Sequence, residues 1–447
     1  MSRPGEPWSR KFVVHNQAMF KRLQRFVLTA LLSLVLVAPL TTSAWSQAHA
    51  SDRMAAADKQ AVLDSLTGII EKDAFVPNVD FKEWQGFLDK QRPAIDKAGN
   101  QGEFGAAVQK ALNGFGFSHF YLMTPQMVDT REKHRVVGIG IMITPDPSGV
   151  GIARVYPGSP AEKAGLVPGD VIVTVEGKKA ETSAPIRGDE GTDVNIEVLH
   201  ADGKRQKYKL WRASYSTAEL ASLKFADADT AVIRIPTFDV SYNRQDVDAL
   251  MKKAADAKNL VVDLRNNPGG AVVNMMHFMG LVLKDKSVVG TFINSNSVRA
   301  YQKDHPGPVD IVKVADATTN HLNISPQMVP YFKGSLAVLI NGASGSAAEM
   351  TAAALHDLRG ATVVGSKSAG AVLISVMRPL PGGFRLQFPL ADYVTSNGQR
   401  LEGHGVVPDF TVRDPRFPGR DKDEPLDKAV AIIEKMDAQR ASLAPAA

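Results

Sequence analysis

The sequence has no cysteine among its 447 residues. This absence excludes disulfides, thiol catalysis and cysteine-based metal sites. The histidines show neither HExxH nor any similar metal-ligand spacing, and no internal repeat is found. The composition, 44% hydrophobic with 22% charged residues, is that of an ordinary globular chain of two or three domains. No metal or cofactor is therefore implied.

The chain also lacks an excess of basic residues outside its first 50 residues, although its formal net charge is +5. Residues 1–50 contain six of the 52 basic residues and one of the 47 acidic residues, which leaves 46 of each in the remainder. The apparent basicity thus belongs to the first segment alone, and it gives no support for nucleic-acid binding.

That first segment has the pattern of a secretory signal. A basic stretch over Lys21–Arg25 precedes an apolar run over Phe26–Leu40, and Ala48 to Ala50 form an A-x-A-like cleavage site. We expect cleavage near Ala50 and export, with the periplasm as the predicted location. The alternative is an uncleaved anchor, and membrane contact is expected only in that case. The run is short for a full span, and no later segment approaches that length.

The remaining chain divides into four parts by pattern. Residues 51–130 read as helical, residues 131–215 as a β-rich unit with Gly and Pro turns, and residues 216–415 as alternating strands and helices. Residues 416–447 read as a terminal helix with a polar tail. The alternation predicts an α/β core with a largely parallel sheet. Within it, residues 384–388 and 393–395 are expected to form a late hairpin.

A serine-rich turn joins a buried strand to a helix inside the core. Leu336–Ile340 is apolar, and Ala347–Leu355 has helical character. Ser346 would therefore lie at a helix N-terminus, beside unpaired N–H groups that can stabilise an oxyanion. This is a suitable position for a nucleophile, while the alternative is a simple helix cap. Ser344 is a weaker rival, better interpreted as a turn or cap residue.

The β-rich unit contains the string PGSPAEKAGLVPGD, residues 157–170. It resembles a PDZ domain of the type found in bacterial proteases. On that resemblance, Gly138, Ile139, Gly140 and Ile141 stand where PDZ domains bind a peptide's terminal carboxylate. The peptide would add as a strand to an exposed sheet edge. The alternative is a β-rich spacer without a ligand.

Further segments extend the resemblance over about residues 115–440. DLRNNPGG at residues 263–270, the Ser346 turn and the segment 397–409 together resemble the tail-specific, or C-terminal-processing, serine protease family. The family implies an α/β core of ClpP/crotonase-like β-α units, preceded by an inserted PDZ domain, that cleaves polypeptides. It also implies Ser346 as the nucleophile, with an oxyanion hole formed by the N–H groups of Ala347 and of Gly269 or Gly270.

The sequence departs from the family at the general base. The processing proteases use a lysine about 25 positions after the serine, and residue 371 here is alanine. Lys367 is an alternative base if desolvation lowers its pKa. A branch exemplified by the tricorn protease instead uses Ser-His-Ser-Glu, and Ser118, His119 and Glu402 match its positions.

On that match His119 is the general base. Ser118 and Glu402 would fix the orientation of its ring, or Glu402 would position the scissile bond. Two alternatives remain open at this point. Phe117 and Phe120 could simply bury His119, and His404 is a weaker candidate base.

These readings predict an exported serine endopeptidase whose PDZ domain binds the C-termini of protein or peptide substrates. The alternative is an inactive pseudoprotease that acts as a peptide-binding module. A third candidate, a carrier of hydrophobic small molecules built on the same core, is disfavoured by the intact PDZ string. The segment 294–333 is expected to be a lid or an interface, and the oligomeric state stays open.

Overall fold

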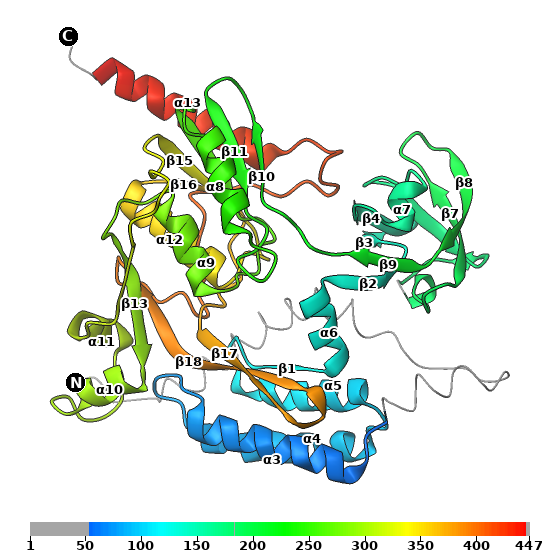
Figure 1. The fold of residues 1–447 in the computed structure, drawn as a ribbon, viewed down its shortest axis with the longest axis horizontal. Helices are drawn as coiled ribbons and strands as arrows, with labels where there is room; N and C mark the ends of the chain where they lie inside the picture. Colours follow the sequence, from blue (N-terminus) through cyan, green and yellow to red (C-terminus); the bar gives the residue numbers. More distant parts are fainter. Residues whose placement is uncertain (1–52, 183, 444–447) are drawn as a thin grey trace, which may run out of the picture.

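The computed structural model describes residues 53–182 and 184–443. The predicted secretory signal lies outside these residues. Four separate regions are visible along the chain (Figure 1): a layer of N-terminal helices, a β-rich domain set apart from the rest, a large α/β core, and a long C-terminal helix. Within the described residues, no helix has both the length and the apolar character needed to cross a membrane.

The N-terminal region is helical, as the apolar spacing predicts. Asn100 caps one of its helices by accepting a hydrogen bond from Glu103 N–H at 2.9 Å. Trp84 and Phe104 are fully buried among the helices, and the same cluster includes Phe388 of a later strand and Phe384 just before that strand. The helices therefore pack against a sheet of the core. They are α3 (Ala56–Asp73), η1 (Phe81–Glu83), α4 (Trp84–Lys97), α5 (Gln101–Leu112), η2 (Asn113–Phe115) and α6 (Pro125–Lys133).

The core is built on a six-stranded sheet in the order β10-β11-β12-β15-β16-β19. All its pairings are parallel except the edge pair β10–β11, so the predicted parallel sheet is observed. β12 and β15 are buried along their whole length, which explains their continuous apolar runs. The strands are β10 (Ser222–Phe225), β11 (Thr230–Arg234), β12 (Asn259–Asp263), β15 (Ser335–Ile340), β16 (Thr362–Gly365) and β19 (Phe410–Thr411).

Helices cover both faces of this sheet. The face that carries Ile233 and Val338 packs against α8 (Arg244–Lys253), α9 (Val272–Gly280) and α12 (Ala347–Arg359). The opposite face packs against the C-terminal helix α13 (Glu424–Leu443). The prediction of helices after the strands is thus confirmed, and the switch from strand to helix at Ser346 lies at the carboxyl end of β15.

A second, antiparallel sheet joins the core to the N-terminal helices. Its order is β1-β18-β13-β14, with β17 also paired to β18. The predicted late hairpin is wrong, because residues 384–388 and 393–395 belong almost wholly to one long strand, β18. The hairpin is formed by β17 and β18 instead, since Gly382 and Gly383 adopt positive φ in the turn between them. The strands are β1 (Tyr121–Met123), β13 (Val288–Asn294), β14 (His321–Asn323), β17 (Ile374–Pro379) and β18 (Arg385–Thr395).

The segment 294–333 packs as an interface. Its helices α10 (Ser295–Gln302) and α11 (Ile311–Ala317) bury Val298 and Val314 against Val394 of β18. Asn78 of the N-terminal region exchanges two hydrogen bonds with the backbone of Val309, at 2.8 and 2.9 Å. This segment therefore ties the N-terminal helices to the core.

The β-rich domain is an insertion whose entry and exit lie side by side. β2 (Arg135–Gly138) leads in, and β9 (Ala213–Ser216) pairs with it on the way out. The next strand begins only at Ile141, because Gly140 adopts φ +83° and interrupts the extended backbone after Gly138. The remaining elements are β3 (Ile141–Asp146), β4 (Gly149–Val155), α7 (Pro160–Lys163), β5 (Val171–Val175), β6 (Lys178–Lys179), η3 (Ala184–Ile186), β7 (Asp193–Leu199) and β8 (Arg205–Trp211).

The contact between the helices and the second sheet predicts a large effect of Phe384→Ala. Phe384 is 1% exposed and meets Phe104 edge to face, with centroids 5.6 Å apart. We expect a loss of about 3–5 kcal/mol in the free energy of unfolding, measured by chemical denaturation. Phe225→Ala, at a side chain that is 52% exposed, is the control and should change this free energy by less than about 0.5 kcal/mol. Equal losses in the two variants would contradict this packing.

Candidate active site

Ser346 is the N-cap residue of α12, and its backbone is strained. It adopts φ 54° and ψ −119°, a conformation that residues with side chains rarely occupy. Its N–H donates to Ala371 O and to the Glu349 carboxylate, each at 2.9 Å. These bonds hold the strained turn. Ser344, by contrast, is buried and donates its hydroxyl to Leu264 O at 2.8 Å, which makes it a turn residue.

The Ser346 hydroxyl begins a continuous chain of hydrogen bonds. Its Oγ lies 3.1 Å from His119 Nε2, and His119 Nδ1 lies 2.6 Å from Ser118 Oγ. Ser118 Oγ donates to Glu402 Oε2 at 2.8 Å. Because Ser118 gives its proton to Glu402, it accepts from Nδ1, and Nε2 is left to accept from Ser346. The hydrogen bonds that link the four side chains thus all run in one direction, from the Ser346 hydroxyl toward the Glu402 carboxylate.

Burial sets the charge states of His119 and Glu402 in this hydrogen-bonded series. Desolvation lowers the pKa of His119 from 6.5 to about 4, so its ring is neutral at physiological pH. Desolvation also raises the pKa of Glu402 to about 7. Hydrogen bonds from Ser118 N–H, Ser118 Oγ and Val372 N–H oppose this rise, because they stabilise the carboxylate. A neutral imidazole beside a hydroxyl is a competent proton acceptor.

Local packing explains how His119 reaches Ser346. His119 follows the η2 turn with φ +63°, a second strained position in the site. Phe120 is buried against Phe115 and Phe81, with ring centroids at 4.9 and 5.8 Å. The aromatic neighbours therefore anchor the segment, while the imidazole remains part-buried and turns toward Ser346.

The glycines of the DLRNNPGG segment lie against the Ser346 turn. A Cβ on Gly269, at φ +98°, would come within 2.7 Å of Ser346 Cβ and 3.0 Å of Ala347 N. Gly269 N–H donates to Asn267 Oδ1 at 2.8 Å, so it is already used. Among the described residues, no partner is seen for the N–H groups of Gly270 and Ala347. Of the two glycines expected at an oxyanion hole, Gly270 thus has the available donor.

The other candidate bases lie elsewhere. Lys367 is exposed, so the desolvation expected of a displaced base is not found. His404 is also exposed, and its Nδ1 contacts Glu402 O at 3.0 Å. Ala371, where the resemblance to the processing proteases implied a lysine, contributes its backbone: its carbonyl accepts from Ser346 N–H and its N–H donates to Glu349.

Sequence reasoning missed Glu349. This fully buried carboxylate accepts from the N–H groups of Ser346 and Ala371 at 2.9 Å, and from Gly370 N–H and Ser368 Oγ at 2.6 Å. Burial raises its pKa and these four donors oppose the rise. A glutamate three residues into a helix is a capping signal, and this signal could have identified it. In the described part of the chain, no cluster of three or more His, Asp and Glu side chains is arranged to bind a metal.

The expected peptide-binding loop of the β-rich domain sits beside an open sheet edge. The carbonyls of Ile139 and Gly140 accept from Ala161 N–H and Tyr156 N–H, at 2.8 and 2.9 Å. Gly138 ends β2 and Ile141 begins β3. Within the described residues, β3 pairs only with β4, so its other edge has no strand beside it.

Comparison with known families gives two matches. Residues 229–412 match the profile of Peptidase family S41, and residues 151–199 match that of a PDZ domain. The chain carries an S41 peptidase domain and a PDZ domain. The predicted resemblance to C-terminal-processing proteases is therefore confirmed at the level of the family. The S41 match includes Ser346, Glu402 and both glycines, whereas Ser118 and His119 lie upstream of it.

Two named relatives agree with this assignment. A "Probable CtpA-like serine protease" of Staphylococcus aureus is 28% identical over 289 residues, which cover 63% of this chain and 53% of that protein. A "Carboxyl-terminal-processing protease" of Synechocystis sp. is 27% identical over 333 residues, covering 71% and 72%. The chain spans about half the length of the staphylococcal relatives that it matches.

A solved structure shows the same fold. "Structure of mature CPAF complexed with lactacystin" aligns with 87% of this chain and 99% of its own chain, at a TM-score of 0.51 and 12% identity. At this identity the likeness concerns the fold alone. The predicted α/β core with a PDZ domain and an N-terminal helical segment is confirmed.

The buried environment of His119 beside Ser346 predicts its titration. We expect the ring to remain neutral as pH falls to about 4, with the proton on Nδ1, because burial penalises the imidazolium. Nitrogen NMR of the histidine side chains measures both properties, and His119→Gln assigns the signals. A midpoint near the ordinary 6.5 would contradict this burial effect.

Proposed function

We propose that this chain is a serine endopeptidase in which Ser346 is the nucleophile and His119 the general base. The observation that supports it best is the hydrogen-bonded chain from Ser346 Oγ through His119 and Ser118 to Glu402. A serine hydroxyl needs a base within hydrogen-bond reach, and the 3.1 Å contact to Nε2 provides one.

Acylation follows from this geometry. His119 Nε2 takes the proton of Ser346 Oγ as the oxygen attacks the carbonyl carbon of a peptide bond. The carbonyl oxygen becomes an oxyanion that accepts from the N–H groups of Ala347 and Gly270, at the positive end of the α12 dipole. The imidazolium then gives its proton to the leaving nitrogen, the C–N bond breaks, and an acyl-enzyme remains.

Deacylation repeats these roles with water. His119 removes a proton from a water molecule that attacks the acyl carbon, and Ser346 regains its proton when the ester bond breaks. In both halves Ser118 and Glu402 keep Nδ1 protonated and stabilise the transient imidazolium. This role requires Glu402 in its charged form.

The PDZ domain supplies substrate selection in this proposal. The free edge of β3, next to the loop Gly138 to Ile141, suits an extended peptide that adds as a strand and presents its terminal carboxylate. Polypeptides with suitable C-termini are the proposed substrates. The leader pattern in residues 1–50 supports export, with the periplasm as the proposed location.

One observation favours a second function. Alanine at position 371 removes the lysine that the processing proteases use, and a chain without a working base would be a PDZ-based peptide-binding module. The contact between His119 and Ser346 weighs against this candidate, because it supplies a base from a different part of the chain.

Labelling with a fluorophosphonate probe tests the nucleophile and the base. We expect rapid labelling of the full-length protein, none in Ser346→Ala, and a rate at least about 10³-fold lower in His119→Ala. Lys367→Ala is the matched control and should label at the wild-type rate. Labelling that survives His119→Ala but is lost in Lys367→Ala would exclude His119 as the base. An unlabelled wild type that also leaves casein intact would favour the binding module.

The pKa of Glu402 gives a pH prediction. Its pKa is raised to about 7, so the carboxylate forms as pH rises through that value. Since the carboxylate stabilises the imidazolium of the transition state, kcat/KM should rise with pH through about 7. In Glu402→Gln this rise should disappear and activity should be low throughout. Profiles from about pH 5 to about pH 9 measure it. An unchanged profile in the variant would assign the rise to another group.

A further inference from the structure

The peptide group between Gly269 and Gly270 is hydrogen-bonded through its carbonyl to a neighbouring loop. Phe238 N–H donates to Gly269 O at 2.8 Å, and Thr237 Oγ1 donates to the same oxygen at 3.2 Å. In a trans peptide the C=O and N–H groups point in opposite directions. Fixing the Gly269 carbonyl toward this loop therefore fixes the direction of the Gly270 N–H on the other side.

The loop is also in direct contact with Gly270. A Cβ on Gly270 would lie 2.2 Å from both Phe238 C and Asp239 N, so the glycine backbone packs directly against the Phe238–Asp239 peptide. Ala271 N–H donates to Phe238 O at 2.9 Å and continues this pairing. Any displacement of the Phe238–Asp239 peptide is consequently transmitted to Gly270.

That peptide accepts from Asn274 Nδ2 and donates to Thr237 Oγ1, both at 3.0 Å, and the side chains of its two residues add anchors on either side. On one side the Phe238 ring is fully buried, with the rings of Tyr242 and Phe278 at 5.7 and 6.1 Å. On the other side the Asp239 carboxylate accepts from Arg131 of α6 at 2.6 Å. The first anchor belongs to the core, whereas the second comes from a different region of the chain.

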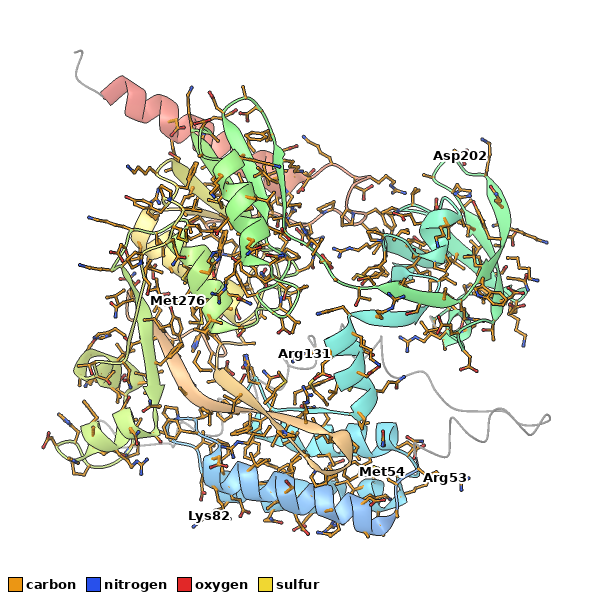
Figure 2. The ribbon with its side chains drawn as sticks, in the orientation of Figure 1. Arg53, Met54, Lys82, Arg131, Asp202 and Met276 are labelled. Atoms are coloured by element: carbon orange, nitrogen blue, oxygen red, sulfur yellow. The ribbon has the colours of Figure 1, made fainter. Side chains whose placement is uncertain are left out.

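Arg131 is itself well placed to act as an anchor. Its guanidinium also contacts Met377 Sδ of β17 at 3.2 Å, and its side chain is 30% exposed, as is that of Asp239. It lies on α6, between the N-terminal helices and the PDZ domain (Figure 2). A planar guanidinium held on two sides restricts the carboxylate that it binds more than a flexible ammonium would.

We propose that Arg131 and Asp239 are a positioning pair that sets the direction of the Gly270 N–H toward the oxyanion. This inference rests on the proposed peptidase function. Neither side chain is assigned a contact with the substrate. Their effect passes from the ion pair to the Phe238–Asp239 peptide, then to the Gly269 carbonyl and so to the Gly270 N–H.

The pair should affect the transition state more than substrate binding. An oxyanion donor interacts most strongly with the charge that develops during reaction, and its complete removal costs about 10²–10³-fold in kcat. Loss of the pair misdirects the donor without removing it, so we expect a decrease of about 10-fold in kcat with KM changed by less than about twofold. A peptide aldehyde, which forms a tetrahedral adduct with Ser346, should lose affinity in the same proportion.

The test uses Arg131→Met, Asp239→Asn and the double variant in the full-length protein. Each single variant should show the decrease in kcat and in aldehyde affinity, and the double variant should be no worse than either single one, because the two side chains act as a unit. Glu132→Gln is the matched control. It removes a different ion pair of α6, with Arg385 of β18, and should leave kcat unchanged.

Thermal denaturation checks that all variants are folded. Wild-type kcat in both single variants, purely additive losses, or an equal loss in Glu132→Gln would overturn the positioning role while leaving the peptidase function intact. A wild-type protein that neither hydrolyses peptides nor reacts with the fluorophosphonate would instead overturn the peptidase function, and the positioning role with it.

Discussion

The site depends on two buried carboxylates that share one backbone segment. Glu349 accepts from Ser368 Oγ and from the N–H groups of Gly370 and Ala371, and Glu402 accepts from the next N–H, that of Val372. An isolated buried carboxylate is costly, and these donors offset that cost. In the same segment, the carbonyl of Ala371 accepts a hydrogen bond from Ser346 N–H. Ser346 and the side chains that orient His119 are therefore tied to one framework.

This framework explains why distant regions must fold together before a site exists. Ser118 and His119 come from the N-terminal region, and both oxygens of Glu402 reach Ser118. The second sheet makes this possible, because β1, directly after His119, pairs with β18. β18 also pairs with β17, which directly follows Val372 and Leu373. A single long strand thus sets the distance between His119 and Ser346.

The sequence predicted local features well and distant pairings poorly. The Ser346 turn, the parallel strands and the helices follow from apolar spacing and turn chemistry. The course of β18 did not, because the strand runs through Pro389, which pairs with Ser375, although proline is uncommon inside a paired strand. Nor could spacing separate Gly269 from Gly270, since that distinction depends on where the Asn267 side chain bonds. Arg131 and Asp239 are 108 positions apart, and no local signal connects them.

The alanine at position 371 has a physical explanation in this framework. Both polar groups of its backbone are used, the N–H by Glu349 and the carbonyl by Ser346, so the position serves the turn whatever side chain it carries. In the proposed mechanism the proton acceptor comes instead from the opposite side, where His119 and Ser346 meet with both backbones at positive φ. Such strain persists only where the surroundings fix it, and here the aromatic cluster and the buried carboxylates do so. A geometry suited to proton transfer is therefore present without a lysine at position 371.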